Sequence, residues 1–220
     1  MINIFFKKCV GYAYVPRFRG IFYVMVRLLL IRHGATEASE KKLLLGSTDS
    51  EVSSAGLQQL KRLSALVEPY KPGSWYCSSM QRAVQTAEKL HSCGVIDQQS
   101  IVDDRLKEID FGRWEQKSFA EIEVSDPDLI QAWSQYDDFV FPGGEAVAAF
   151  SGRIAEMLEL FRSAGQKQIG IVTHGGVIRN MICLSLGIST RNYLLFSVNP
   201  ASLTIIDLYP EGGVLAGLNM

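Results

Sequence analysis

Apolar positions along the chain fall into two alternating patterns. Short continuous apolar runs predict buried strands at residues 26–31, 75–77, 169–173 and 202–208. Between them lie longer segments with an apolar residue every three or four positions, which predict amphipathic helices. This alternation is typical of an α/β fold, and we expect a three-layer sandwich in which a mostly parallel sheet is flanked by helices.

Two of the helices are expected to begin at serines. Ser53 is predicted to cap the first helix, which should end before Pro69. Ser78 or Ser79 is predicted to cap the second, which places Arg82 in its first turn, beside the end of the preceding strand. The predicted apolar face of the first helix comprises Leu57, Leu60, Leu63 and Leu66.

The segment 115–142 breaks the alternation and is predicted to form an insertion above the sheet. Ser118 and Glu121 have the spacing of a capping box. Pro127 should open a further short helix, which carries Trp133. We therefore expect two short helices in this segment.

Residues 1–24 differ from the rest because they are rich in aromatic and basic residues and contain no acid. A secretory signal needs an uninterrupted apolar core, which Arg17 and Arg19 break. A basic interfacial anchor stays open, although a proline and a glycine oppose one continuous helix. We favour a dispensable extension ahead of an alternative start at Met25, so the domain proper is assigned to residues 25–220.

Composition limits the partners. A chain of 220 residues, 47% of them apolar, can bury the core of one domain. A net charge of -1 provides no general attraction to nucleic acid, and no run reaches the roughly 18 uncharged apolar residues of a membrane span, so neither nucleic acid nor stable membrane association is expected. The four isolated cysteines favour free thiols in a cytoplasmic protein. No metal or other cofactor is expected, and the oligomeric state stays open.

Two histidines are expected at the carboxyl ends of strands, where open α/β sheets place their ligand sites. His33 belongs to the sequence Arg-His-Gly at 32–34, and His174 to the sequence His-Gly-Gly at 174–176, just before a predicted helix. Each glycine leaves an unhindered amide beside an imidazole, and a helix N-terminus favours anions. A single histidine at a strand end is more often a packing residue, but the two together with Arg82 predict an anion site.

Six motifs, in order along the chain, resemble those of the histidine phosphatase superfamily, also called the phosphoglycerate mutase-like family. The similarity runs from about Val26 to Leu208, and it implies a phosphatase with its site at the carboxyl ends of the strands. The motifs are Leu30 to Glu37; Gly46 with Asp49 and Ser53 to Gly56; Ser78 to Ala87; Leu106 to Glu115; Pro142 to Glu145; and Thr173 to Gly176.

The resemblance implies a role for each matching site residue. His33 is implied to be the nucleophile that becomes phosphohistidine, and Glu108 the proton donor to the leaving oxygen. His33 must attack as the neutral base, whereas His174 helps most when protonated, so the site needs their pKa values shifted in opposite directions. We expect bound phosphate to supply the charge that raises the pKa of His174. The implied phosphate contacts are Arg32, Arg82, His174 and Gly175. The implied substrate contacts are Ser39, Gly46 and Ser47.

Two positions depart from the family pattern. Ser39 stands where many members carry an asparagine that touches the phosphate. A hydroxyl reaches less far, so we expect weaker phosphate affinity or a different substrate. Gln116 stands where glycine is common, and its side chain is expected to narrow the entrance near Glu108.

The expected activity is hydrolysis of a small phosphomonoester. Trp133 and the Pro142 to Glu145 motif resemble those of the bacterial alpha-ribazole phosphatases of the late cobalamin pathway, which makes alpha-ribazole 5'-phosphate the first candidate substrate. A broad-specificity sugar-phosphate phosphatase and a cofactor-dependent phosphoglycerate mutase share the same core and stay open, although the short 115–142 segment favours a phosphatase. A non-catalytic protein that binds phosphorylated ligands is a remote alternative.

Overall fold

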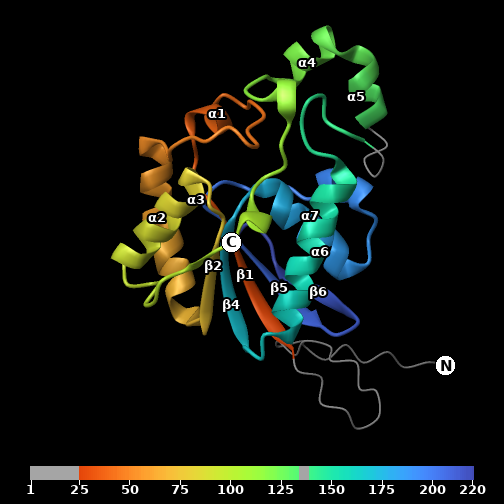
Figure 1. The fold of residues 1–220 in the computed structure, drawn as a ribbon. Coiled ribbons are helices and arrows are strands. Elements are labelled where there is room, and N and C mark those ends of the chain that lie inside the picture. Colours follow the sequence, from red (N-terminus) through yellow and green to blue (C-terminus); the bar gives the residue numbers. More distant parts are fainter. Residues whose placement is uncertain (1–24, 134–138) are drawn as a thin grey trace, which may run out of the picture.

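The computed structural model describes residues 25–133 and 139–220. They form a six-stranded sheet in the order β3-β2-β4-β1-β5-β6, with helices on both faces (Figure 1). The predicted N-terminal extension, 1–24, lies outside the described residues. The strands are β1 (Val26–Arg32), β2 (Ser74–Cys77), β3 (Ile101–Val102), β4 (Gln168–Thr173), β5 (Leu203–Tyr209) and β6 (Gly212–Gly217).

Parallel pairing holds the middle of the sheet together. β1 lies parallel to β4, β4 to β2, and β2 to β3. At the other edge, β5 is antiparallel to β1, and β6 is antiparallel to β5. The mostly parallel sheet is therefore confirmed. The β5–β6 pair is antiparallel because two residues, Pro210 and Glu211, join the strands, and so short a turn can only reverse the chain.

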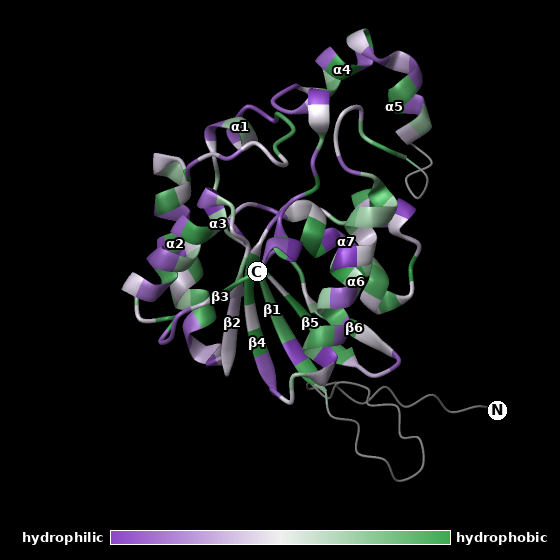
Figure 2. Cartoon of the chain, viewed as in Figure 1, coloured by the Kyte–Doolittle hydropathy of each residue, from purple (hydrophilic) through white to green (hydrophobic). Residues whose placement is uncertain are grey.

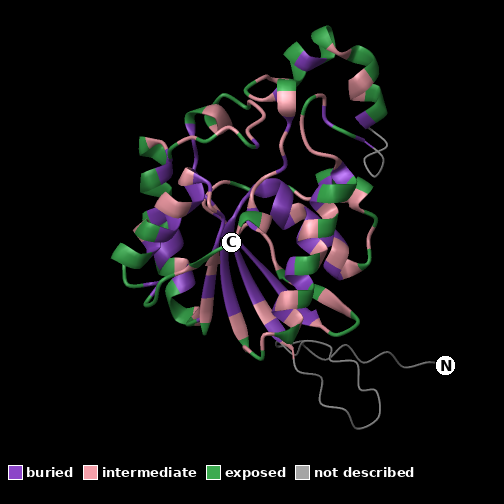
Figure 3. Ribbon diagram, in the orientation of Figure 1, coloured by how far each residue is buried: buried purple, intermediate pink, exposed green. Residues whose placement is uncertain are grey.

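Alternate residues of β1 enter two separate cores, because successive strand side chains point to opposite faces. Leu29 and Ile31 pack with residues of α2 and α3, whereas Leu28 and Leu30 pack with residues of α6 and α7. The middle strands β1, β4 and β5 are apolar and mostly buried (Figures 2 and 3). The three predicted layers are thus confirmed. The covering helices are α2 (Ser54–Val67), α3 (Gln81–Ser92), α6 (Val147–Ser163) and α7 (Gly175–Leu186).

The start of α2 agrees with the prediction, but its buried face does not. Ser53 caps the helix, since its hydroxyl accepts the N–H of Gly56. Leu57, however, is 43% exposed. A helix turns about 100° per residue, so Leu57 and Leu66, nine positions apart, lie on opposite sides of it. The face that is buried comprises Gly56, Leu60, Leu63, Ser64 and Val67.

Helix α3 begins without the serine cap that the sequence predicted. Met80 occupies the N-cap position, and no side chain caps the helix there. Ser78 Oγ instead accepts the Met80 N–H and contacts the ring of His174, and Ser79 donates to an aspartate. Arg82 does lie in the first turn, as predicted.

Short helices stand above the carboxyl ends of the strands (Figure 1), where the insertion was predicted. The Ser118–Glu121 capping box is present. Trp114 is fully buried; it stacks on Phe139 and meets Trp133 edge-on, which ties this upper region to the domain. The α-helices here are α1 (Glu37–Glu40), α4 (Phe119–Ser125) and α5 (Pro127–Trp133). Short 3-10 helices lie at Glu68–Tyr70, Asp104–Leu106, Gly112–Trp114 and Thr190–Leu195.

Two strands of the sheet, β3 and β6, were not predicted. β3 has only two residues, both exposed, and β6 is rich in glycine. Cys77 and Cys183 are buried free thiols. Burial raises their pKa values to about 12 and about 11, so both thiols stay protonated near neutral pH. Over the residues that the structure describes, no helix is both long enough and apolar enough to cross a bilayer.

Candidate active site

The two predicted histidines meet at one edge of the sheet. His33 follows β1 and His174 follows β4, and these strands are parallel neighbours whose last residues, Arg32 and Thr173, are paired. The backbone N–H of His33 donates to the Thr173 carbonyl at 3.0 Å. As a result, the centroids of the two imidazole rings are 5.1 Å apart.

His33 presents one ring nitrogen with a free lone pair. Its Nδ1 is 2.7 Å from the Gly34 carbonyl oxygen, which can only accept, so Nδ1 carries the proton and Nε2 does not. The side chain is 3% exposed. Burial, with Arg32 and Arg82 nearby, holds the pKa of His33 well below its usual range, so the ring is neutral at physiological pH.

His174 has protein partners at both ring nitrogens. Arg82 Nε donates to Nδ1 at 3.2 Å, so Nε2 carries the proton and donates to Ser78 Oγ at 2.8 Å. Burial and the charge of Arg82 hold the pKa of His174 well below its usual range too. In the protein by itself both pKa values are therefore lowered, because both rings lie among the same arginines. The predicted rise for His174 depends on a bound phosphate dianion, whose charge would favour the protonated ring, and it stays a prediction.

Arg82 is fully buried and holds three acceptors at once. Besides His174, it donates from Nη1 to the Thr48 carbonyl at 3.0 Å and from Nη2 to the Gly46 carbonyl at 2.8 Å. Thr86 links it to the first histidine loop, since its hydroxyl donates to the Arg82 carbonyl and accepts the Gly34 N–H. These contacts fix the guanidinium beside both rings.

Arg32 has a buried N–H group, at Nε, that lacks an acceptor among the described residues. Its Nη1 donates to the Val198 carbonyl at 2.5 Å, whereas its Nε is buried and has no hydrogen-bond partner within the described chain. Burial lowers the pKa of Arg32 to about 10, opposed by the charge of Glu108, so the group stays cationic. A Cβ on Gly175 would lie 3.3 Å from Arg32 Nε, so a glycine there keeps the space beside this donor open. A buried cation with an unused N–H is suited to an anion.

Glu108 reaches the start of α7, where the second histidine motif ends. Its Oε2 accepts the Gly176 N–H at 2.8 Å. A Cβ on Gly176 would lie 2.3 Å from Glu108 Oε1, so only glycine admits the carboxylate here. The structure thus brings Glu108 to the same strand edge as the two histidines.

Two residues that support the site were missed by the sequence analysis. Arg153, from α6, ties down the backbone around Glu108 by donating to the carbonyls of Arg105, Lys107 and Glu108, and it pairs with the Glu145 carboxylate at 2.9 Å. An arginine at the apolar spacing of α6, three residues after Phe150, was the available signal. Glu115 accepts the backbone N–H groups of Gly46, Ser47, Thr48 and Phe111.

The three predicted substrate contacts each bond to other parts of the protein. Ser39 Oγ donates to the Thr36 carbonyl and accepts the Thr36 N–H, so it caps α1. Ser47 Oγ donates to Asp110. Gly46 holds Arg82 through its carbonyl, and a Cβ there would lie 1.9 Å from the Ile109 carbonyl oxygen. That these three residues touch the substrate stays a prediction.

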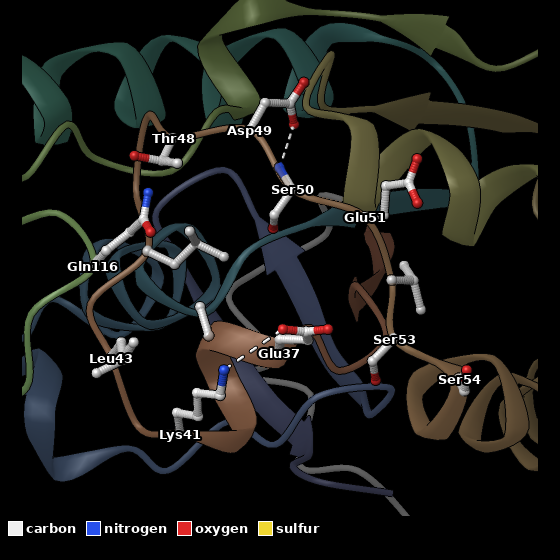
Figure 4. Close-up of a pocket in the computed structure, with 13 residues that line it drawn as sticks. Glu37, Lys41, Leu43, Thr48, Asp49, Ser50, Glu51, Ser53, Ser54 and Gln116 are labelled. Atoms are coloured by element: carbon white, nitrogen blue, oxygen red, sulfur yellow. Dashed lines mark hydrogen bonds and ion pairs between the residues drawn. The ribbon is translucent and has the colours of Figure 1, made fainter.

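Two pockets flank the site. One, of about 170 Å³, has Glu108 in its wall. The other, of about 480 Å³, is polar; Figure 4 shows it between α1, the loop around Thr48 and Gln116. Gln116 therefore faces the polar pocket and does not line the pocket beside Glu108, contrary to the sequence prediction. Its φ of +59 explains why glycine is common there, because L side chains rarely adopt a left-handed backbone.

No metal site accompanies these groups: within 25–133 and 139–220, no cluster of three histidine, cysteine, aspartate or glutamate side chains could hold an ion. Buried guanidiniums beside a neutral imidazole suit a phosphoryl group, and this places the protein among the α/β enzymes of phosphoryl transfer. Residues 28–220 match the model of the histidine phosphatase superfamily (branch 1), and the chain belongs to this family.

Several curated relatives are named as phosphatases, and the chain covers nearly all of their length. Two Hydrogenobacter thermophilus proteins named for phosphoserine phosphatase activity are 31% and 28% identical, over 89% of this chain and 96% and 93% of theirs. The adenosylcobalamin/alpha-ribazole phosphatase of Escherichia coli K12 is 28% identical over 88% of this chain and 96% of its own. Among solved structures, the alpha-ribazole phosphatase of Shigella flexneri has a TM-score of 0.78 and 27% identity, covering 89% of this chain and 96% of that one. The protein is a phosphatase.

Proposed function

We propose that the protein hydrolyses a small phosphomonoester through a phosphohistidine formed at His33. The observation that carries this proposal is the hydrogen-bond pattern of the two histidines. His33 donates its Nδ1 proton to Gly34, which leaves the Nε2 lone pair for attack, whereas both ring nitrogens of His174 have protein partners. His33 is therefore the better nucleophile of the two.

The reaction balances in two steps. In the first, His33 Nε2 attacks phosphorus in line with the departing oxygen; the N–P bond forms, the P–O bond to the alcohol breaks, and Glu108 gives the alcohol oxygen its proton. In the second, the Glu108 carboxylate takes a proton from water as the water oxygen attacks phosphorus, and the N–P bond breaks with its electron pair returning to His33. Alcohol and phosphate leave, and one water is consumed.

Charge on the transferred group would be held by the buried cations. Arg32 Nε is an unused donor, and the fixed Arg82 guanidinium adds a second positive charge beside the two rings. The Gly175 amide lies at the first position of α7, where helix N–H groups are unpaired and favour anions. Because phosphoryl transfer depends mainly on position and charge stabilisation, these groups suit the transition state.

The first candidate substrate is alpha-ribazole 5'-phosphate, because relatives that match nearly all of this chain carry that name. Phosphoserine is the second candidate, since it is named in two further relatives of similar coverage. Sugar phosphates and the phosphoglycerate mutase reaction stay as alternatives, because the same His33, Arg82 and Glu108 would serve each of them.

The test is steady-state phosphate release from alpha-ribazole 5'-phosphate, O-phosphoserine, 3-phosphoglycerate and fructose bisphosphates, with His33→Ala as the blank. A kcat/KM advantage of about a hundredfold for one compound would identify the substrate. Formation of 2-phosphoglycerate without phosphate release would make the protein a mutase. Absence of any His33-dependent turnover, with phosphorylated ligands still bound, would leave a non-catalytic binding protein and overturn the proposal.

A further inference from the structure

The smaller pocket, beside Glu108, has an unusual wall. It has a volume of about 170 Å³ and opens next to the carboxylate that the proposed mechanism places at the departing alcohol. Most of its remaining wall is aromatic or aliphatic, and Arg179 is the other charged side chain in it. The apolar residues of the wall are Leu44, Ile109, Phe111, Phe119, Trp133, Phe141, Tyr193 and Leu194.

The aromatic side of the pocket is a packed unit. Phe119 of α4 stacks on Trp133 of α5, with centroids 5.6 Å apart and ring planes 14° from parallel. Trp133 in turn meets Phe141 at 5.8 Å. Trp133 and Phe141 are buried, so protein contacts alone hold this wall in place and no bound substrate is needed.

The rim of the pocket is apolar and open to solvent. Phe119 is 46% exposed, and Leu194, from the 3-10 helix Thr190–Leu195, is 58% exposed. They come from segments about 75 residues apart in the chain, yet both line this pocket. Exposed apolar side chains around a pocket favour the binding of an apolar group, because covering them removes apolar surface from water.

The size of the pocket fits one ring. An apolar cavity of about 150 Å³ is enough to bind benzene. Sugar hydroxyls placed there would lose water and find mainly aromatic and aliphatic side chains, because Glu108 and Arg179 are the charged side chains that line the pocket. A flat apolar group would instead replace water at the rings and at Leu194.

We infer that this pocket binds an aromatic ring carried by the alcohol half of the substrate. The enzyme then selects phosphomonoesters of ring-bearing alcohols over phosphoserine, glycerate and simple sugar phosphates. The inference depends on the proposed function, because the Glu108 role is what places the departing alcohol beside the pocket. Phe119 and Leu194 are the residues of the rim that determine this preference.

The test compares three alkyl phosphates whose leaving oxygens are all primary: 2-phenylethyl phosphate, propyl phosphate and O-phosphoserine. They make a similar demand for a proton, so a difference in kcat/KM reports the pocket and not the acid. We expect kcat/KM for 2-phenylethyl phosphate to exceed that for propyl phosphate and for O-phosphoserine by about tenfold or more, the size of effect that burial of a ring gives.

Matched variants locate the effect. Phe119→Ser and Leu194→Ser should each lose at least about fivefold more on 2-phenylethyl phosphate than on propyl phosphate. The controls are Val124→Ser, on the same helix as Phe119 and 86% exposed, and Leu195→Ser, next to Leu194 and 78% exposed. Neither control residue lines the pocket, and both variants should keep the preference of the original protein.

The outcomes separate the two proposals. Equal rates on the phenylethyl and propyl esters, a preference for O-phosphoserine, or equal losses in the rim and control variants would overturn the ring pocket while leaving the phosphatase intact. If no ester is hydrolysed in a His33-dependent way, the proposed function fails. The pocket is then judged by calorimetric binding of 2-phenylethyl phosphonate against propyl phosphonate, and equal affinities would overturn it.

Discussion

His33 and His174 look alike in the sequence and differ in what holds them. Each follows a strand, precedes a glycine and is buried, and each has a lowered pKa because of burial and the same arginines. His33, however, bonds to the backbone of its own loop through Gly34. His174 is held by side chains from the start of α3 and the turn before it, Arg82 and Ser78.

The difference teaches that a local motif does not decide the role of a histidine. His33, the proposed nucleophile, has an Nε2 lone pair that the tautomer leaves free, whereas His174 is a fixed member of a hydrogen-bond network. The partners that create this difference come from residues far away in the sequence. Four experiments test the contrast, from the largest expected effect to the smallest.

The largest effect should separate the two histidines directly. His33→Ala should abolish turnover and leave no phosphoenzyme, because no other ring nitrogen replaces Nε2. His174→Ala should lower kcat by about a hundredfold, because Arg82 loses the ring nitrogen that positions its guanidinium, but the variant should still form phosphoenzyme. Rapid quench with ³²P-labelled substrate measures both. Residual turnover of His33→Ala above about a hundredth of the original rate would remove His33 from the nucleophile role.

The next effect concerns Glu108, which is proposed to serve only the leaving oxygen. Glu108→Gln should lower kcat/KM for alkyl phosphates by about a hundredfold or more, but lower it much less for 4-nitrophenyl phosphate, because a nitrophenolate departs without a proton. Glutamine keeps an acceptor for the Gly176 N–H, so the fold should be retained. Equal losses on the two substrate types would contradict the acid role.

A moderate effect is expected in the dependence of stability on pH. Both histidines are neutral in the folded protein, whereas in the unfolded chain they take up protons below about pH 6.5. The free energy of unfolding should therefore be largest above pH 6.5. It should fall below that pH by about 1.4 kcal/mol per pH unit for each histidine. Urea unfolding at pH 7.5 and 5.5 measures it, and His174→Asn should show about half the loss. An identical loss in the variant would mean that His174 is not held neutral.

The smallest effect should come from Ser78. Ser78→Ala removes the acceptor of the His174 Nε2 proton but keeps Arg82 on the other nitrogen. We expect a loss of kcat of about threefold to tenfold, as for a neutral hydrogen bond. The control is Cys77→Ser, at the preceding residue, whose side chain packs in the core formed with α2 and α3. It reports any disturbance of β2. A loss as large as that of His174→Ala would show that Ser78 alone positions the ring.

The sequence predicted the layers and the two histidines because those depend on local patterns. Periodicity located β1, β4 and the four covering helices, and the strand ends located His33 and His174. The supporting roles of Arg153 and Glu115 were not predicted, because these side chains bind backbone carbonyls and amides of other loops. Such contacts leave no pattern in the sequence. The predicted buried face of α2 was wrong because a helix has about 3.6 residues per turn, so leucines spaced three apart point in successively different directions. Gln116 lines the polar pocket and not the pocket beside Glu108.

The pairing of β1 with β4 also bears on how such an enzyme can diversify. Neighbouring strands in any sheet lie about 4.8 Å apart, and the two rings, at 5.1 Å, inherit that interval from the backbone. A lineage could not alter the interval without changing the order of the strands. The walls of the pocket beside Glu108, in contrast, come from surface segments that tolerate insertion and replacement. Reaction chemistry is thus inherited with the architecture, while the choice of alcohol can be rewritten one surface segment at a time.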